Sequence, residues 1–283
     1  SLTRKRSQVR VLPHPPVGGS SPKFFLEVSE LDRLDFAIKL LRRVGYFLLQ
    51  NWGKVDRVFT KSDFKDLVTD IDKESQRIIV ENIKKHFPDE HIIAEEGIFE
   101  KGDKIWIVDP IDGTVNFVHG LPSFSISLAY VEKGRIVLGV VHVPVTGETF
   151  YAINGEGAYM NGERINDSGR KDLRECVGST GNYPGFTGKL ILSLDNRIRR
   201  IRILGSAAAS AAYVGAGKFD FFVAKGINPW DVAASMLIVR ESGGKVTDFE
   251  GNNANINSHS FVFSNSLIHD EILKVIKAIS KEL

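Results

Sequence analysis

A short apolar run near the middle of the chain ends directly in acidic residues. Residues 105–108 (IWIV) have the pattern of a buried strand, and the motif DPIDGT follows, with Asp109 and Asp112 three positions apart. Pro110 fixes its own φ and favours an extended conformation at Asp109, so the chain turns sharply at this point. We therefore expect the two carboxylates to point toward one place, with the carbonyl of Ile111 nearby.

The residues after this turn favour the binding of an anion. Gly113 permits close backbone approach, and residues 114–118 have the pattern of a helix start, whose free N–H groups favour negative charge. Two hard carboxylates, a carbonyl and an anion site together suit Mg²⁺ with a phosphate. A turn at a strand end, with a solvated pair of aspartates and a helix cap, is the alternative interpretation.

Further acids stand at comparable places in the chain. Glu95 and Glu96 follow the apolar segment HIIA and precede Gly97, as at the end of a strand. Asp231 lies in NPWDVAA, in the first turn of a helix that Asn228 is expected to cap. In that position it could merely make a favourable contact with the helix dipole, of about 0.3–1 kcal/mol.

The apolar neighbours of Asp231 favour a different role. Between Trp230 and the segment VAA its carboxylate is expected to be partly buried, and a buried carboxylate needs a cationic partner. Because the motif has no excess of lysine or arginine, a metal ion is the simplest partner. Two or more Mg²⁺ ions, roughly 3.5–4 Å apart as in sites that hydrolyse phosphate esters, would be held by Glu95, Asp109, Asp112 and Asp231.

Hydrophobic periodicity divides the body of the chain into two halves. In the first half, residues 31–50 and 70–86 have the spacing of amphipathic helices, and residues 124–165 alternate as antiparallel hairpins. The second half predicts strands at 199–204, 219–224, 245–249 and 261–265, and helices at 206–214, 229–241 and 269–281. We expect an α+β fold in which an antiparallel-sheet half (31–170) packs on an α/β half (171–283) and both contribute to one site.

Residues 1–30 differ from the rest of the chain. They contain five basic and two acidic residues, are rich in proline, glycine and serine, and have neither helical nor strand periodicity. Since the whole chain carries a net charge of +2, the remaining residues sum to −1 and give no basic field that would capture nucleic acid. We expect a disordered extension, derived from cloning or from a mis-assigned start. A basic nucleic-acid arm or an organellar transit peptide is the alternative.

The composition excludes several classes of protein. With 42% hydrophobic and 25% charged residues over 283 positions, a disordered or low-complexity polymer is excluded. The apolar runs are too short to span a bilayer, and the single cysteine, Cys176, excludes an internal disulfide framework and a cysteine-based zinc site. We expect a soluble, cytoplasmic protein.

Two segments resemble the inositol monophosphatase family, which consists of Mg²⁺-dependent, lithium-sensitive carbohydrate phosphatases. They are GIFEKGDKIWIVDPIDGTVNFVHGLPSFSISLAYVEKG and NPWDVAASMLIVRESGGKVTD. The resemblance runs from about residue 31 to the end of the chain. It implies a layered α-β-α-β-α sandwich, usually a homodimer, with two or three Mg²⁺ ions per active site and a small phosphate ester as the partner.

The resemblance also implies a role for each matching residue. The metal ligands would be Glu95, Asp109, the Ile111 carbonyl, Asp112 and Asp231. The catalytic residues that orient and activate the attacking water would be Glu95 and the pair Asp72 and Thr114. The substrate contacts would be Asp112, Gly113, Thr114, Gly205, Ser206, Ala207 and Asp231. Two loop residues near a third metal would be Lys61 and Asp66, and Glu96 would lie outside the coordination sphere.

The implied reaction is hydrolysis of a phosphate monoester by a metal-activated water, with myo-inositol 1-phosphate as the first candidate substrate. Animal inositol phosphatases place a glutamate seven residues before the aspartate of WD to bind inositol hydroxyls, whereas this chain has Ala224 there, followed by Lys225. Room therefore remains for fructose 1,6-bisphosphate, glycerol phosphate, other sugar phosphates, or the substrates of the 3′-phosphoadenosine and histidinol-phosphate phosphatase branches. A regulatory, RNA-associated protein on the same fold is the alternative from another class. Loss of a metal ligand would favour it, and none is lost.

Two further features have simple structural interpretations. His119, just past DGTVNF, is expected at a helix end or facing solvent rather than in catalysis. Four alternating arginines are expected on the solvated face of an edge strand rather than in a phosphate or RNA patch; they are Arg197, Arg199, Arg200 and Arg202.

Overall fold

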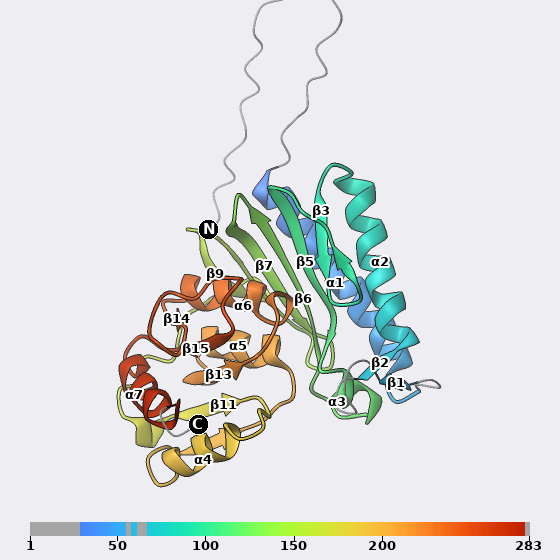
Figure 1. Cartoon of the computed structure of the whole chain (residues 1–283). Helices are drawn as coiled ribbons and strands as arrows, with labels where there is room; N and C mark the ends of the chain where they lie inside the picture. Colours follow the sequence, from blue (N-terminus) through green and yellow to red (C-terminus); the bar gives the residue numbers. More distant parts are fainter. Residues whose placement is uncertain (1–28, 55–57, 61–66, 281–283) are drawn as a thin grey trace, which may run out of the picture.

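Helices and sheets alternate in five layers across the molecule (Figure 1). The computed structural model describes residues 29–54, 58–60 and 67–280. An eight-stranded sheet and a five-stranded sheet form the second and fourth layers. The helical layers are α1 (Glu30–Asn51) with α2 (Asp70–His86), α5 (Ala207–Gly215) with α6 (Pro229–Glu241), and α4 (Thr187–Leu194) with α7 (His269–Ser280). The predicted α-β-α-β-α sandwich is confirmed.

Some expectations concern residues outside the described part of the chain. These are the expectations for residues 1–28 and for Lys61 and Asp66. Within the described ranges, no helix combines the length and the apolar character needed to cross a membrane.

The eight-stranded sheet is mainly antiparallel, in the order β10-β9-β8-β7-β6-β5-β3-β4, with β3 and β5 parallel. Its strands are β3 (His91–Ala94), β4 (Ile98–Phe99), β5 (Lys104–Asp112), β6 (Ser125–Glu132), β7 (Arg135–Val143), β8 (Glu148–Ile153), β9 (Gly157–Met160) and β10 (Glu163–Ile165). Strand β5 is buried on both faces, because Trp106 and Val108 pack in the cluster beneath α1 and α2 while Ile107 packs toward α5 and α6. This double burial explains the continuous apolar run that precedes Asp109.

Caps fix the starts of the two helices that carry functional acids. The Thr69 hydroxyl accepts the N–H of Ile71 and of Asp72, and the Asp72 carboxylate accepts the Thr69 N–H at 2.8 Å. At α6, Asn228 and Asp231 form the equivalent box, with the Asn228 N–H 2.6 Å from Asp231 Oδ2. These boxes explain why the predicted helices 70–86 and 229–241 have the observed boundaries.

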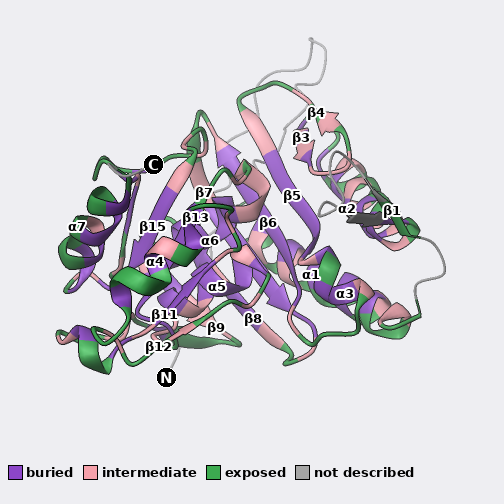
Figure 2. Cartoon of the chain, turned by 60° about the horizontal axis from the view of Figure 1, so that its bottom comes forward, coloured by how far each residue is buried: buried purple, intermediate pink, exposed green. Residues whose placement is uncertain are grey.

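Small side chains allow α5 and α6 to lie between the two sheets. The buried face of α5 is built from alanines, including Ala208 and Ala212, and α6 adds Ala233 and Ala234. A Cβ added at Gly139 of β7 would lie 2.6 Å from the Ala234 carbonyl oxygen, so the helix backbone touches the sheet. Figure 2 shows these two helices mostly buried, whereas α7 exposes one side.

The five-stranded sheet is mixed, in the order β12-β11-β13-β15-β14. Its strands are β11 (Val177–Thr180), β12 (Arg200–Arg202), β13 (Phe221–Lys225), β14 (Lys245–Thr247) and β15 (Ser260–Ser264). Strand β11 runs parallel to both β12 and β13, and the other pairs are antiparallel. The remaining elements are the hairpin β1 (Val58–Thr60) and β2 (Leu67–Thr69), the short helix α3 (Thr114–Val118) and the 3₁₀ helix η1 (Leu173–Glu175).

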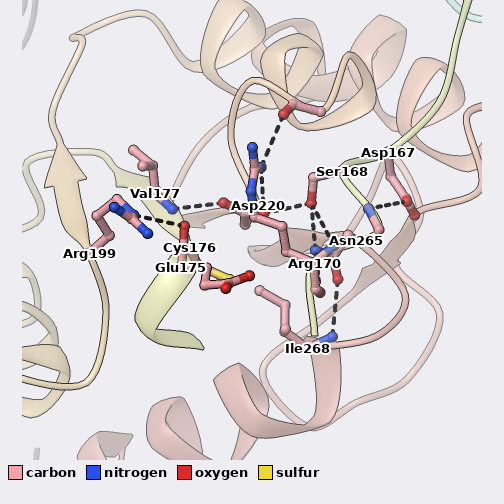
Figure 3. Close-up of polar contacts among 12 residues, drawn as sticks. Asp167, Ser168, Arg170, Glu175, Cys176, Val177, Arg199, Asp220, Asn265 and Ile268 are labelled. Carbon is pink, nitrogen blue, oxygen red and sulfur yellow. Dashed lines mark hydrogen bonds and ion pairs between the residues drawn. The ribbon is translucent and has the colours of Figure 1, made fainter. Parts of the chain in front are cut away.

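A buried carboxylate fastens this sheet to the segment that connects the two halves (Figure 3). Asp220 accepts hydrogen bonds from the Val177 N–H at 2.7 Å, the Ser168 hydroxyl at 2.5 Å and the Arg170 guanidinium at 3.1 Å. Asn265 donates to the same Ser168 oxygen at 2.8 Å. The start of β11 and the chain leaving β10 are thereby held against β13.

One local prediction needs correction, and two elements were not predicted. The strand predicted at 199–204 is shorter, since β12 spans only Arg200–Arg202; it is an edge strand, and all four arginines of this segment are exposed, as expected. Strand β11 and helix α4 were not predicted. In α4 the apolar run LILSL has no side-chain cap that would mark the start of a helix.

Candidate active site

The turn after β5 brings two carboxylates to the edge of the larger sheet. Asp109 pairs with Ser127 and Asp112 with Ser125, and the register shifts between these two pairs. The Asp109 carboxylate also accepts the Ile111 N–H at 3.1 Å, which closes the turn. Both aspartates are buried, at 1% and 7% exposure.

Asp231 approaches the same place from the other half of the chain. It lies in the first turn of α6 and is half-buried. One carboxylate oxygen each from Asp109, Asp112 and Asp231 lie within 4.8 Å of one another. Three acids from two distant motifs therefore form one cluster, as the sequence predicted for their positions.

Glu95 stands beside this cluster. It follows β3, which runs parallel to β5, so both strands end at the same edge. Its carboxylate contacts that of Asp109, although it is not one of the three acids that meet most closely. The backbone of Glu96 is bound to the side-chain amide of Gln76. The Glu96 N–H donates to the amide oxygen at 2.8 Å, and the amide nitrogen donates to the Glu96 carbonyl at 3.0 Å.

The electrostatics of the cluster call for a cation. Burial, and after it the charges of Glu95, Asp112 and Asp231, raise the pKa of Asp109 well above its ordinary value. Among the ion pairs of the described residues, none supplies Asp109 or Asp112 with a lysine or arginine. A buried cluster of hard oxygen donors fits a divalent ion such as Mg²⁺.

Asp112 has a second set of contacts that the sequence did not reveal. Its carboxylate accepts the N–H groups of Ala207 and Ala208 at 2.9 and 2.8 Å, at the start of α5. The hydroxyls of Ser206 and Ser125 donate to Oδ2 at 2.5 and 2.9 Å. Burial raises the pKa of Asp112, and these bonds oppose the rise because they stabilise the carboxylate.

The predicted pair of Asp72 and Thr114 is in contact. The Thr114 hydroxyl lies 3.0 Å from Asp72 Oδ1 and 3.1 Å from the Ile111 carbonyl oxygen, and can donate to either. Asp72 is fully buried, which raises its pKa, while the Thr69 hydroxyl donates to its other oxygen at 2.5 Å. Thr114 thus lies between a buried acid and the turn that holds the aspartates.

Asn116 joins the two loops on either side of the cluster. Its amide donates to the carbonyls of Ser123 at 2.6 Å and Leu204 at 2.7 Å. Gly113 and Gly205 have φ of +100° and +75°, and a Cβ on Gly113 would lie 3.0 Å from the Gly205 carbonyl. The turn of DPIDGT and the turn before α5 are therefore packed backbone to backbone. His119, at the end of α3, is exposed, as expected.

A cavity of about 230 Å³ opens beside the carboxylates. Of the predicted residues, its walls include Asp112, Gly205, Ser206, Ala207 and Asp231. They also include Thr180 at the end of β11 and the loop at residues 181–183 that follows it, which was not predicted. A turn-rich segment at the carboxyl end of a parallel strand is the signal that could have indicated it.

The structure locates Ala224, the residue at the position where animal inositol phosphatases have a glutamate. Ala224 of β13 is fully buried and faces α5 and α6, on the side of the cavity. Lys225 faces the opposite side of the sheet, where its ammonium lies 5.7 Å from the centre of the Phe186 ring. The lysine next to Ala224 therefore does not occupy the place of that glutamate.

Known proteins resemble the chain over nearly its whole described length. The profile of the inositol monophosphatase family matches residues 30–281. The chain is 63% identical over 253 residues to a fructose-1,6-bisphosphatase/inositol-1-monophosphatase of Thermotoga maritima, covering 89% of this chain and 99% of the relative. It is 40% identical over 255 residues to the Nus factor SuhB of Pasteurella multocida, covering 86% and 95%. The solved structure of a T. maritima IMPase matches with a TM-score of 0.87 and 64% identity, covering 89% and 99%.

Proposed function

The chain belongs to the inositol monophosphatase family, and from this premise we propose that it is a Mg²⁺-dependent phosphatase with myo-inositol 1-phosphate as its first candidate substrate. The observation that carries the proposal is the convergence of Asp109, Asp112 and Asp231 beside a cavity large enough for a small ester. A regulatory, RNA-associated protein would not need such a cluster. We therefore place catalysis first.

The residues present fit a divalent metal. Asp109, Asp112 and Asp231, with Glu95 and the Ile111 carbonyl, would hold it, and these are hard oxygen donors in a buried, anionic site. When bound, Mg²⁺ would neutralise phosphate charge and make a water molecule more acidic. Three of the four hydrogen bonds that Asp112 accepts go to Oδ2 and one goes to Oδ1, so Oδ1 is the oxygen that would bind the ion.

The chain's own residues would orient the reactants. Asp72 would orient the Thr114 hydroxyl by accepting a hydrogen bond from it, so that the Thr114 oxygen can accept a hydrogen bond from the attacking water. The backbone N–H groups of Gly113 and Thr114 would contact the phosphate. The start of α5, bound to Asp112, would lie against the leaving group.

Two substrate classes are favoured by separate observations. The T. maritima relative is named for both fructose-1,6-bisphosphatase and inositol-1-monophosphatase. Ala224 removes the glutamate that would favour inositol, so we also propose a broader sugar phosphatase, including activity on fructose 1,6-bisphosphate.

The test is phosphate release from a panel of esters with and without Mg²⁺. The panel is myo-inositol 1-phosphate, fructose 1,6-bisphosphate, glycerol phosphate, 3′-phosphoadenosine 5′-phosphate and histidinol phosphate. We expect activity on the first two, loss of activity in EDTA, and inhibition by LiCl beyond that of KCl, because Li⁺ carries half the charge of Mg²⁺ at similar size. Activity that survives EDTA would overturn the proposal.

Variants at Thr114 test the proposed water-orienting pair. Thr114→Val removes the hydroxyl, and we expect kcat to fall by about 10²–10⁴-fold, the range of a positioned proton-transfer group. Thr114→Ser keeps the hydroxyl and should retain most of the activity. Equal activity of the two variants would exclude a role for the hydroxyl.

A further inference from the structure

Tyr183 lies in the wall of the cavity, which the start of α5 also lines, and has no part in the chemistry described above. We propose that its hydroxyl donates a hydrogen bond to a hydroxyl oxygen of the leaving group, so that the enzyme selects phosphate esters of polyols. The inference rests on the proposed phosphatase function and names the group that recognises the substrate's alcohol.

The backbone around Tyr183 is held firmly. The Tyr183 N–H donates to the Thr187 hydroxyl at 2.8 Å, and that hydroxyl donates to the Gly181 carbonyl at 2.8 Å. The Tyr183 carbonyl accepts the N–H groups of Phe186 and Thr187 at 3.1 and 3.0 Å. The loop between β11 and α4 therefore holds the backbone of Tyr183 in one conformation.

Gly181 allows the ring to lie over the loop. A Cβ at this position would be 2.4 Å from both Cζ and the hydroxyl oxygen of Tyr183. The glycine is needed for this close approach, which turns the ring back over the end of β11 instead of outward into solvent. The hydroxyl oxygen also contacts the backbone N–H of Lys225, at the end of β13.

The other hydroxyls in the cavity wall are already engaged with the protein. The Ser206 hydroxyl donates to Asp112, and the Ser210 hydroxyl donates to the Ser206 carbonyl. The Thr180 hydroxyl lies within hydrogen-bond distance of the carbonyls of Gly181 and Val223. For Tyr183, no acceptor of the hydroxyl proton is present among the described residues. Its proton therefore remains available to a ligand.

The charges around the cavity favour a donor at this place. Burial, and after it the charge of Asp231, raise the pKa of Tyr183 above its ordinary value, so the phenol is protonated at neutral pH. Among the described residues, none that lines the cavity is a lysine or arginine. A polyol hydroxyl can both accept from Tyr183 and donate to a carboxylate, whereas an aryl leaving group has no hydroxyl that could make both bonds.

The experiment compares Tyr183→Phe with the wild type on esters of two kinds, in Mg²⁺. We expect kcat/KM for myo-inositol 1-phosphate and fructose 1,6-bisphosphate to fall about tenfold, mainly through KM, as for the loss of one hydrogen bond. For p-nitrophenyl phosphate, kcat/KM should stay within about twofold of the wild type. The control Tyr213→Phe removes a phenol hydroxyl that donates to Glu148, away from the cavity. It should leave kcat/KM unchanged for both kinds of ester.

A purely structural role would lower kcat/KM equally for both kinds of ester. That result, or an unchanged kcat/KM for the polyol esters, would overturn the inference.

A binding measurement separates the role of Tyr183 from the proposed phosphatase function. Calorimetric binding of myo-inositol in the presence of Mg²⁺ and inorganic phosphate needs no turnover, and Tyr183→Phe should weaken it about tenfold. If the wild type hydrolyses none of the esters, the proposed function fails. Equal binding of myo-inositol by wild type and variant refutes the role of Tyr183.

Discussion

At the scale of single residues, Asp112 shows how one side chain can serve two parts of the molecule. Its carboxylate accepts the first N–H groups of α5, and it also faces Asp109 and Asp231. Moving Asp112 would therefore shift the acid cluster and the wall of the cavity together. The start of α5 and the acid cluster are coupled through the two oxygen atoms of this carboxylate.

Asp109 should destabilise the folded state when no cation is present. Its burial and its acidic neighbours penalise the charged form, as the raised pKa indicates. We expect Asp109→Asn, which keeps the acceptor for the Ile111 N–H, to raise the Tm in EDTA by a few degrees, since about 1 kcal/mol shifts Tm by ~2–4 °C in a protein of this size. Added Mg²⁺ should raise the Tm of the wild type more than that of the variant. A lower Tm of Asp109→Asn in EDTA would contradict the argument.

Two buried histidines predict a loss of stability in mild acid. Burial is the main cause that lowers the pKa of His142 and of His269 to about 4. As the pH falls below about 6.5, these histidines become protonated in the unfolded chain but stay neutral in the folded chain. The free energy of unfolding therefore falls by about 1 kcal/mol per histidine between about pH 7.5 and 5.5.

Urea unfolding at the two pH values measures this loss. His142→Gln, which can still bond the Thr149 hydroxyl, should show a smaller difference between them than the wild type. An equal difference in both proteins would show that His142 does not contribute.

The candidate site could be predicted from the sequence where the evidence is local. Asp109, Asp112 and Asp231 interrupt apolar segments, and that interruption is visible in the sequence. Tyr183 and Asn116 were missed because their roles depend on contacts with segments far away along the chain. No local pattern encodes such distances. The Asp72–Thr114 contact came from the family resemblance alone.

At the scale of elements, helix boundaries were predictable where side chains cap the ends. Helices α2 and α6 begin directly after Thr69 and Asn228, whose own N–H groups donate to the carboxylates of Asp72 and Asp231, and both helices were predicted at the observed residues. Helix α4 lacks such a cap and has a glycine in its first turn, so its apolar run gave no indication of a helix. Its helical state depends on packing against α7.

Helix α6 positions Asp231 because its backbone touches the larger sheet. The added methyl group of Gly139→Ala would lie 2.6–3.0 Å from backbone atoms of Ala234, which must then move. We expect a destabilisation of about 1–3 kcal/mol and a lower kcat, because Asp231 moves with the helix. Urea unfolding and the phosphatase assay measure both effects.

The matched control is Gly188→Ala in the exposed first turn of α4. Nothing lies within 4 Å of the added methyl group. This variant should gain up to ~1 kcal/mol from helix propensity. If Gly139→Ala is as stable as Gly188→Ala, the contact between α6 and the sheet is not tight.

At the scale of the whole molecule, the two halves predicted from the sequence share one hydrophobic cluster. Ile107 and Val141 of the larger sheet pack with Ala212 of α5 and with Ala233 and Leu237 of α6. The acid cluster is likewise assembled from both halves. Without α5 and α6 of the second half, this face of the larger sheet in the first half would be uncovered.

We therefore expect the protein to unfold as one cooperative unit. Far-UV circular dichroism and enzymatic activity should fall together in urea, with one midpoint. By native-state hydrogen exchange, the slowest amides of β6 and of β13 should open with the same free energy, because exposing either strand requires separating α5 and α6 from it. A fragment of residues 29–170 should not fold, since its sheet would expose the apolar face formed around Ile107 and Val141. Two separate transitions, or a folded fragment, would show that the halves are independent domains whose contact is not required for stability.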